Sequence, residues 1–172
     1  MSIPQTPTRL PDDFAAALGH AISGFGFLEE ALKRAIFALT LTGLGQRPDD
    51  RALAAFLRRM EDIADDTLGT LIDQFVKQMA RAGIEGRETL ARDLRQIRQD
   101  RNLLCHASWK PGSSPERWRP SFLNTQGKVY PGDMGRDDLD AIHARTLHAA
   151  RRSIDIMRQT GIEGEWVGHD PD

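Results

Sequence analysis

The clearest helical pattern in the chain is DDFAAALGHAISGFGFLEEALKRAIFALTLT, residues 12–42. Apolar side chains recur in it at intervals of three and four residues, the pattern of a helix that buries one side. They are Phe14, Leu18, Phe25, Leu28, Leu32, Ile36 and Leu39. Pro11 and two aspartates suit the positive end of a helix, and Gly43 and Gly45 suit its stop. We therefore predict one long amphipathic helix from Asp12 to Thr42.

Two glycines interrupt this pattern on one side of the helix. Gly19 and Gly26 lie seven residues apart, and each is expected to weaken the helix by about 1 kcal/mol. In exchange, a surface without Cβ atoms lets a second backbone come close. We expect tight helix packing at these two positions.

Further helical patterns follow the loop after Gly45. Apolar residues over Leu53–Ile63 predict a second helix. Thr67, preceded by two aspartates, is suited to cap a segment that carries the apolar residues of Leu68–Met79. The pattern leaves open whether these are one kinked helix or two.

The second half of the chain predicts two more helices with an irregular segment between them. The first runs from Arg87 to about Trp109, ahead of Pro111-Gly112, and the last runs from Asp137 to Thr160. Periodicity is lost in between. The β-prone pieces there, Trp118–Leu123 and Lys128–Tyr130, are separated by Thr125-Gln126-Gly127, which predicts a small hairpin.

These elements predict an all-α protein, an up-and-down bundle of four to five helices with a small β-hairpin or irregular insertion before the last helix. We expect a flexible N-terminus over residues 1–11, a single helical domain over 12–160 with the insertion at 110–135, and a polar tail over 161–172.

Composition narrows the class of protein. A chain of 172 residues that is 40% hydrophobic and 28% charged, with a net charge of -2, is typical of one soluble domain. Its single cysteine, Cys105, excludes an internal disulfide and a cysteine-based zinc site. The apolar run Phe14–Leu28 is too short to cross a bilayer, and no signal peptide is recognisable, so we expect a cytoplasmic protein without membrane contact.

The helix predicted from Arg87 carries the residues with the most chemical interest. Projected at 100° per residue, its apolar residues form one narrow stripe, with Arg101 in the middle. The stripe consists of Leu90, Leu94, Ile97 and Leu104, and the opposite face carries Arg95, Gln99, Asn102 and His106. A guanidinium on a buried stripe needs an acid partner, a rim position or a binding site, because an unpaired buried charge is costly.

One copy of this helix makes a poor site. Asn102 and His106 are four residues apart and can touch, whereas Arg101 and His106 are rotated by about 140° around the helix. Two copies that met near their C-terminal ends across a two-fold axis could line one cleft. We therefore expect a homodimer.

The order RNLLCH at residues 101–106, late in a helix and followed by ASW, resembles the HEPN superfamily, whose hallmark is Arg, a polar residue, a few more positions and then His. The context is similar too, with LEEAL at 28–32 in the first helix and TLGTL at 67–71 before the motif helix. The resemblance covers most of residues 12–160. It implies a small helical bundle, usually a homodimer, that in many members is a metal-independent endoribonuclease.

By this resemblance His106 would act as general base or acid at the ribose 2′-hydroxyl, Arg101 would stabilise charge on the phosphate, and Asn102 would position either group. The residue types fit, because imidazole titrates near neutral pH, arginine matches phosphate oxygens, and neither needs a metal. No cofactor is implied. A role in a toxin–antitoxin or defence system, with an antitoxin protein as partner, is one setting for such an enzyme.

Two alternatives remain open. One is a non-catalytic HEPN-like module that dimerises and binds RNA, a nucleotide or a partner protein, in which Arg101 is a structural ion-pair residue and His106 a hydrogen bonder near the helix cap. The other is a helical interaction protein in which the motif is accidental.

Charge along the chain supports RNA as a ligand. Residues 81–136 hold 11 Lys and Arg against 6 Asp and Glu, so this segment is net +5 while the remainder is net -7. The residues expected to contact RNA are Arg95, Arg98, Gln99, Trp109, Arg117 and Arg119. Solvated faces with arginines paired to acids such as Asp93 and Asp100 explain the same charge. Trp118, between two arginines, could stack on a base or pack over the end of the bundle.

The remaining candidates are weaker. His143 and His148 lie five residues apart without a nearby ligand set, so we expect no metal site there. Cys105 projects about 100° away from His106, which is poor geometry for a nucleophilic pair, and we expect a buried, inert thiol. No Gly-rich phosphate loop follows a predicted strand.

Overall fold

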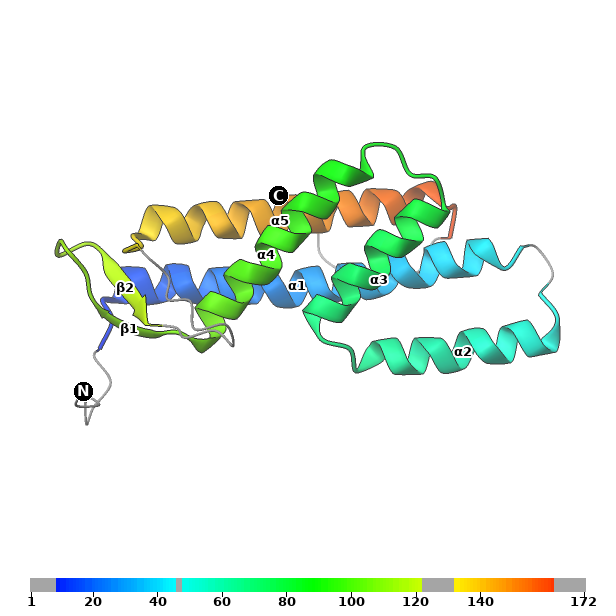
Figure 1. Ribbon diagram of the computed structural model, residues 1–172, viewed down its shortest axis with the longest axis horizontal. Helices are drawn as coiled ribbons and strands as arrows, with labels where there is room; N and C mark the ends of the chain where they lie inside the picture. The colour runs from blue at the N-terminus through cyan, green and yellow to red at the C-terminus, as the bar shows by residue number, and fades with distance from the viewer. Residues whose placement is uncertain (1–8, 46–47, 122–131, 163–172) are drawn as a thin grey trace. The chain divides into compact units, whose positions relative to one another are not determined.

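A computed structural model describes residues 9–45, 48–121 and 132–162, and these residues form five helices and one two-stranded antiparallel sheet (Figure 1). The helices are α1 (Asp12–Gly43), α2 (Asp50–Ala64), α3 (Leu68–Arg81), α4 (Arg87–His106) and α5 (Arg136–Gln159). The strands are β1 (Ser108–Pro111) and β2 (Trp118–Ser121). This confirms the predicted all-α bundle with a small hairpin before the last helix.

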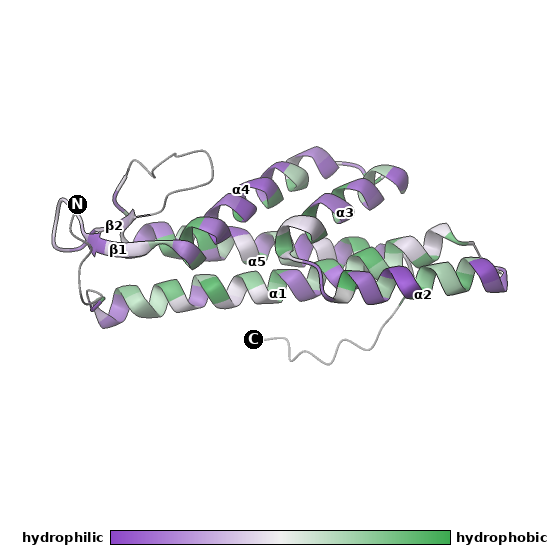
Figure 2. Cartoon of the chain, turned by 60° about the horizontal axis from the view of Figure 1, so that its bottom comes forward, coloured by the Kyte–Doolittle hydropathy of each residue, from purple (hydrophilic) through white to green (hydrophobic). Residues whose placement is uncertain are grey.

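Helix α1 is the long amphipathic helix that the sequence predicts, within one residue at its C-terminal end. Of the seven apolar residues of the predicted stripe, all but Leu18 are buried. Hydrophobic residues follow α1 along its length, whereas hydrophilic residues dominate on α4 (Figure 2). Burial of the stripe, rather than intrinsic helix propensity, is what stabilises a helix of this composition.

The question left open by the sequence, one kinked helix or two, is answered by capping. The side chain of Thr67 accepts a hydrogen bond from the backbone N–H of Thr70, so α3 starts as a separate helix. Asp49 caps α2 in the same way, because its Oδ1 accepts from the N–H of Ala52 at 2.7 Å. Two helices are therefore present where the apolar pattern alone is ambiguous.

The chain divides into two compact units. The first unit comprises Met1–Leu28 and Arg92–Ala149, and the second comprises Glu29–Ala91 and Ala150–Asp172. The first unit contains the hairpin, most of α4 and the first half of α5; the second contains α2 and α3.

Close packing in the first unit involves a glycine other than the two predicted. A Cβ atom built on Gly24 would lie 2.9 Å from Nδ1 of His143 on α5, so Gly24 allows α1 and α5 to approach. Gly19 and Gly26 are exposed, and nothing lies within 4 Å of a Cβ at either position. The prediction that another helix of this chain packs tightly against Gly19 and Gly26 was therefore wrong, because both glycines face away from the core.

The hairpin differs from the predicted one in its first strand. β1 pairs with β2 in antiparallel register from Ser108 with Ser121 to Pro111 with Trp118. The predicted strand from Trp118 is confirmed over its first four residues, whereas the predicted second strand, Lys128–Tyr130, and its turn lie outside the described residues.

The predicted end of the motif helix at about Trp109 was wrong. α4 ends at His106, and the N–H of Ala107 closes its last turn on the carbonyl of Leu103. Trp109 instead lies in β1, where its ring packs edge-on against Phe14 at a centroid distance of 5.2 Å. This long-range contact and the pairing with β2 outweigh continuation of the helix.

None of the helices in the described ranges combines the length and the apolar character that crossing a bilayer requires.

Candidate functional site

The buried stripe of α4 positions the candidate site. Leu90, Leu94, Ile97 and Leu104 are all buried, as the projection predicts. Asp100 flanks this stripe and is also buried, with 9% of its surface exposed. An acid at this position must be satisfied by partners, because burial of an unpaired carboxylate is costly.

Both carboxylate oxygens of Asp100 are satisfied within the first unit. Arg145 on α5 donates from Nη2 to Oδ2 at 2.9 Å, and Gln96, one turn earlier on α4, donates from Nε2 to Oδ1 at 3.0 Å. The sequence alone predicts Asp100 only as a partner of nearby arginines. The signal that could have identified it is an acid at the edge of an apolar stripe, which demands a basic residue on the facing helix.

Arg101 lies at the rim of the stripe. The residue is half-buried, and its Nη1 donates to Oδ1 of Asn102 at 3.4 Å. No carboxylate among the described residues forms an ion pair with it. Although Arg101 lies in the middle of the apolar stripe in the helical projection, its side chain is long enough for the charged group to reach solvent. The donors of this guanidinium that Asn102 does not use remain available to an anion.

His106 is the last residue of α4 and is exposed. Cys105 is exposed as well, so the expected burial of its thiol was wrong. The reason is local: α4 buries Leu103 and Leu104 in its last turn and turns the next two residues outward.

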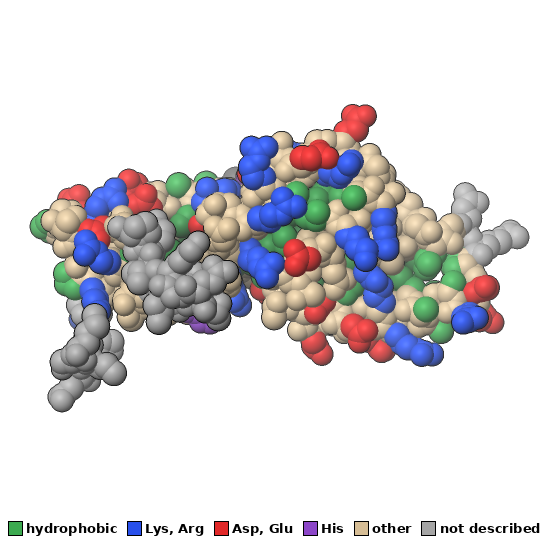
Figure 3. All heavy atoms as spheres, viewed as in Figure 1, with side chains coloured by type: hydrophobic (Ala, Val, Ile, Leu, Met, Phe, Trp, Pro, Cys, Tyr) green, Lys and Arg blue, Asp and Glu red, His purple; other side chains and the backbone are tan. Residues whose placement is uncertain are grey.

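The expected RNA-contacting residues on α4 face solvent. Arg95, Arg98 and Gln99 are exposed, all within the two turns before Arg101. Several arginine side chains gather over α4 on the face shown in Figure 3. A basic helix face that leads to a histidine is a favourable electrostatic surface for a phosphate backbone.

The two tryptophans of the hairpin have a structural role in the first unit. Trp118 is buried, with its ring centroid 6.0 Å from that of Phe14, and the half-buried Trp109 packs on the same phenylalanine. Of the two roles considered for Trp118, packing over the end of the bundle is therefore the one observed. Trp109 retains partial exposure at the surface of the hairpin.

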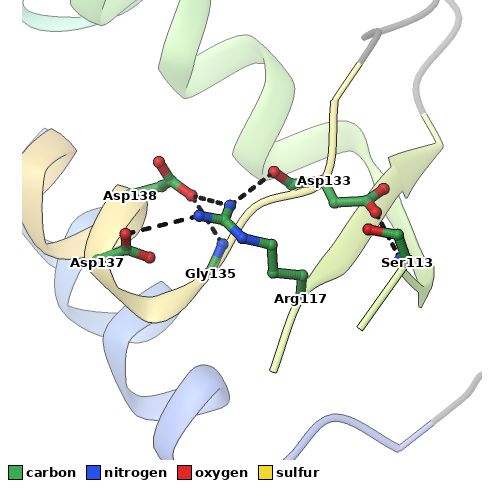
Figure 4. Close-up of polar contacts among 6 residues, drawn as sticks. All are labelled: Ser113, Arg117, Asp133, Gly135, Asp137 and Asp138. Carbon is green, nitrogen blue, oxygen red and sulfur yellow. Dashed lines mark hydrogen bonds and ion pairs between the residues drawn. The ribbon is translucent and has the colours of Figure 1, made fainter. Parts of the chain in front are cut away.

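Arg117 joins the hairpin to the start of α5 (Figure 4). Its Nη1 donates to Oδ2 of Asp138 at 2.9 Å and to the backbone carbonyl of Asp133 at 3.1 Å, and its Nη2 lies 3.7 Å from Oδ2 of Asp137. Asp138 also accepts from the N–H of Gly135 at 2.8 Å. A phosphate would have to compete with these acids for Arg117.

Arg119, on β2, forms an ion pair in the same region. Its Nε donates to Oδ1 of Asp133 at 2.6 Å, and the other carboxylate oxygen accepts from the N–H of Ser113 at 2.6 Å. The hydrogen bond from Arg119, followed by those from Ser113, holds the pKa of Asp133 well below its usual range. Asp133 in turn raises the pKa of Arg119. Counting charges along the sequence does not reveal this neutralisation, because the count ignores which residues meet in the folded chain.

The structure thus brings together Arg101 and Asn102 and places His106 one turn further along, at the exposed helix end. Arg117 and Arg119, in contrast, form ion pairs in and next to the hairpin.

Comparison with known proteins assigns no family, because no family model, no curated protein and no solved structure matches this chain.

Proposed function

We propose that the protein is a metal-independent endoribonuclease that cleaves RNA at a composite site formed by the C-terminal ends of two α4 helices. The observation that carries the proposal is that two adjacent residues differ in their hydrogen-bonding partners. Asp100 is satisfied by Arg145 and Gln96, whereas Arg101 has only an amide oxygen as partner among the described residues. A half-buried guanidinium with unused donors is suited to phosphate.

In the proposed reaction, His106 removes the proton from a ribose 2′-hydroxyl. The 2′-oxygen forms a bond to the adjacent phosphorus, the bond from phosphorus to the 5′-oxygen breaks, and the leaving oxygen takes a proton from the imidazolium of the second copy's His106. The products are a 2′,3′-cyclic phosphate and a 5′-hydroxyl. Arg101 stabilises the charge that develops on the phosphate oxygens, and Asn102 orients Arg101.

A second copy of the chain is part of the proposal. Within one α4, Arg101 and His106 point about 140° apart around the helix axis, so one protomer does not place both on one phosphate. A two-fold axis near the end of α4 would put the arginine of one copy beside the histidine of the other. The exposed faces of Arg95, Arg98 and Gln99 would then extend the cleft on both sides as a path for the RNA backbone.

The test incubates single-stranded RNA with the wild type and with His106→Ala, each with and without EDTA. We expect cleavage in EDTA, cyclic phosphate ends, and a rate about 100-fold to 10,000-fold lower for His106→Ala. DNA should stay intact, because it lacks the 2′-hydroxyl. His148→Ala is the matched control, since His148 is exposed on α5, and it should cut like the wild type.

Three outcomes would contradict the proposal. Equal cutting by the wild type and His106→Ala means contamination or a different site. Binding without cutting by the wild type supports the non-catalytic module instead. A monomer in light scattering at micromolar concentration, rather than about twice 19.2 kDa, removes the composite site.

A further inference from the structure

The second unit contains a cavity of about 680 Å³ that the proposed nuclease site does not use. It lies where the last turns of α1, α3 and α5 meet the side chain of Arg59 from α2. Its volume falls in the range of small-molecule sites, which is roughly 300–1,000 Å³. All of its lining residues belong to the second unit.

One buried polar side chain that lines this cavity has no hydrogen-bond partner in the described protein. Gln78 is 95% buried, lines the cavity, and makes no side-chain hydrogen bond to any described residue. Oγ1 of Thr40 and Nε of Arg59 are unpaired as well, but both atoms are enclosed by protein and do not open into the cavity. Buried polar side chains are almost always paired, so the unpaired amide of Gln78 points to a ligand that completes it.

The ionised side chains of the lining are both cationic. Arg59 is held by a relay, because its Nη2 donates to Oε1 of Gln74 at 3.2 Å and Nε2 of Gln74 donates to Oδ2 of Asp66 at 2.6 Å. Arg81, at the end of α3, is exposed and forms no ion pair with a described carboxylate. No acid lines the cavity, so the two guanidiniums face it without a competing carboxylate.

The helix ends limit how much negative charge a ligand can carry. Three helix C-termini converge here, each with roughly half a negative charge, which offsets most of the two arginine charges. The several negative charges of a polyphosphate would therefore exceed the positive charge that remains in the cavity, whereas a single anionic group would match it. The apolar part of the lining, which includes Leu39 and Ile156, requires the rest of the ligand to be partly hydrophobic.

We propose that this cavity binds a small amphipathic organic acid: one monoanionic group contacts the guanidinium of Arg81, the amide of Gln78 hydrogen-bonds the neutral body, and the apolar part packs between α1 and α5.

The probe for this proposal is 8-anilinonaphthalene-1-sulfonate, a fluorescent monoanion with an apolar body, titrated into the full-length folded protein. We expect saturable binding that octanoate displaces and octylammonium, with the same apolar chain and the opposite charge, does not. Arg81→Gln should weaken binding at least about tenfold, the effect of losing one hydrogen bond to a charged group. Gln78→Leu, nearly equal in volume, should weaken it several-fold.

Arg58→Gln is the matched control, because Arg58 is an exposed arginine of α2 that does not line the cavity, and its affinity should equal that of the wild type. Melting temperatures of all variants show whether each is folded. Unchanged affinity in both Arg81→Gln and Gln78→Leu, displacement by octylammonium as strong as by octanoate, or no binding by the wild type would each overturn the proposal.

Discussion

Arg145 on α5 donates from Nη2 to Oδ2 of Asp100 on α4 at 2.9 Å, and this ion pair joins residues 45 positions apart. It leaves Arg101, the direct neighbour of Asp100, without an acid partner among the described residues. A structural ion pair therefore borders the candidate site and keeps the nearest carboxylate away from the proposed phosphate-binding arginine.

Arg145→Met should lower the free energy of unfolding by about 1–3 kcal/mol, because Asp100 would keep only Gln96 as a partner. Arg151→Met, at an exposed position of the same helix, should change it by less than about 0.5 kcal/mol. Urea unfolding measures both. The double variant Asp100→Asn/Arg145→Met should lose less than the sum of the single variants, since neither charge is then left unpaired.

Alanine substitutions of the glycines in α1 should have opposite effects. Gly19→Ala and Gly26→Ala should each stabilise the protein by about 0.5–1 kcal/mol, because both are exposed helical positions with open space at Cβ. Gly24→Ala should destabilise it, because its Cβ would lie 2.9 Å from Nδ1 of His143. Thermal unfolding of the three variants tests this, and equal shifts for Gly24 and Gly19 would contradict the packing.

The lowered pKa of Asp133 predicts an acid-sensitive hairpin. Because this pKa is lower in the folded state than the value of about 4 in an unfolded chain, the carboxylate stabilises the fold above about pH 4. The contribution is lost as the pH falls from about 4 toward the folded-state pKa. The melting temperature of Asp133→Asn should lie below that of the wild type at pH 7, and the two should converge at low pH.

Arg119→Gln provides a second check on this pH dependence, because the hydrogen bond from Arg119 is the largest cause of the shift. Its melting temperature should approach that of the wild type over the same acidic range. A constant difference between Asp133→Asn and the wild type from pH 7 to pH 3 would show that the carboxylate charge does not stabilise the hairpin.

Trp118→Ala should cost about 3–5 kcal/mol of stability, the usual loss for truncating a buried aromatic side chain. The backbone of residue 118 exchanges two hydrogen bonds of 2.8 Å with Met134, and alanine can keep both, so the loss reports on the ring that packs near Phe14. Lys110→Ala, at an exposed position of β1, is the control and should be nearly neutral by chemical denaturation.

Local sequence patterns determined most of the helices. The apolar period from Phe14 to Leu39 located α1, the Thr67 cap marked the start of α3, and the stripe of α4 was correctly identified as buried. These predictions succeed because helix periodicity and capping depend on residues three or four positions apart. The motif residues Arg101, Asn102 and His106 were also selected from the sequence.

The tertiary structure alone decided which distant residues meet. β1 forms because Trp109 reaches Phe14 and its strand pairs with β2, although the local pattern extends the helix through Trp109. Arg119 is neutralised by Asp133, 14 positions away, and Asp100 by Arg145, so charge counts along the chain cannot show which arginines remain for a ligand. Such pairings depend on chain reversal and on the cost of unpaired buried charge, and no local spacing encodes either.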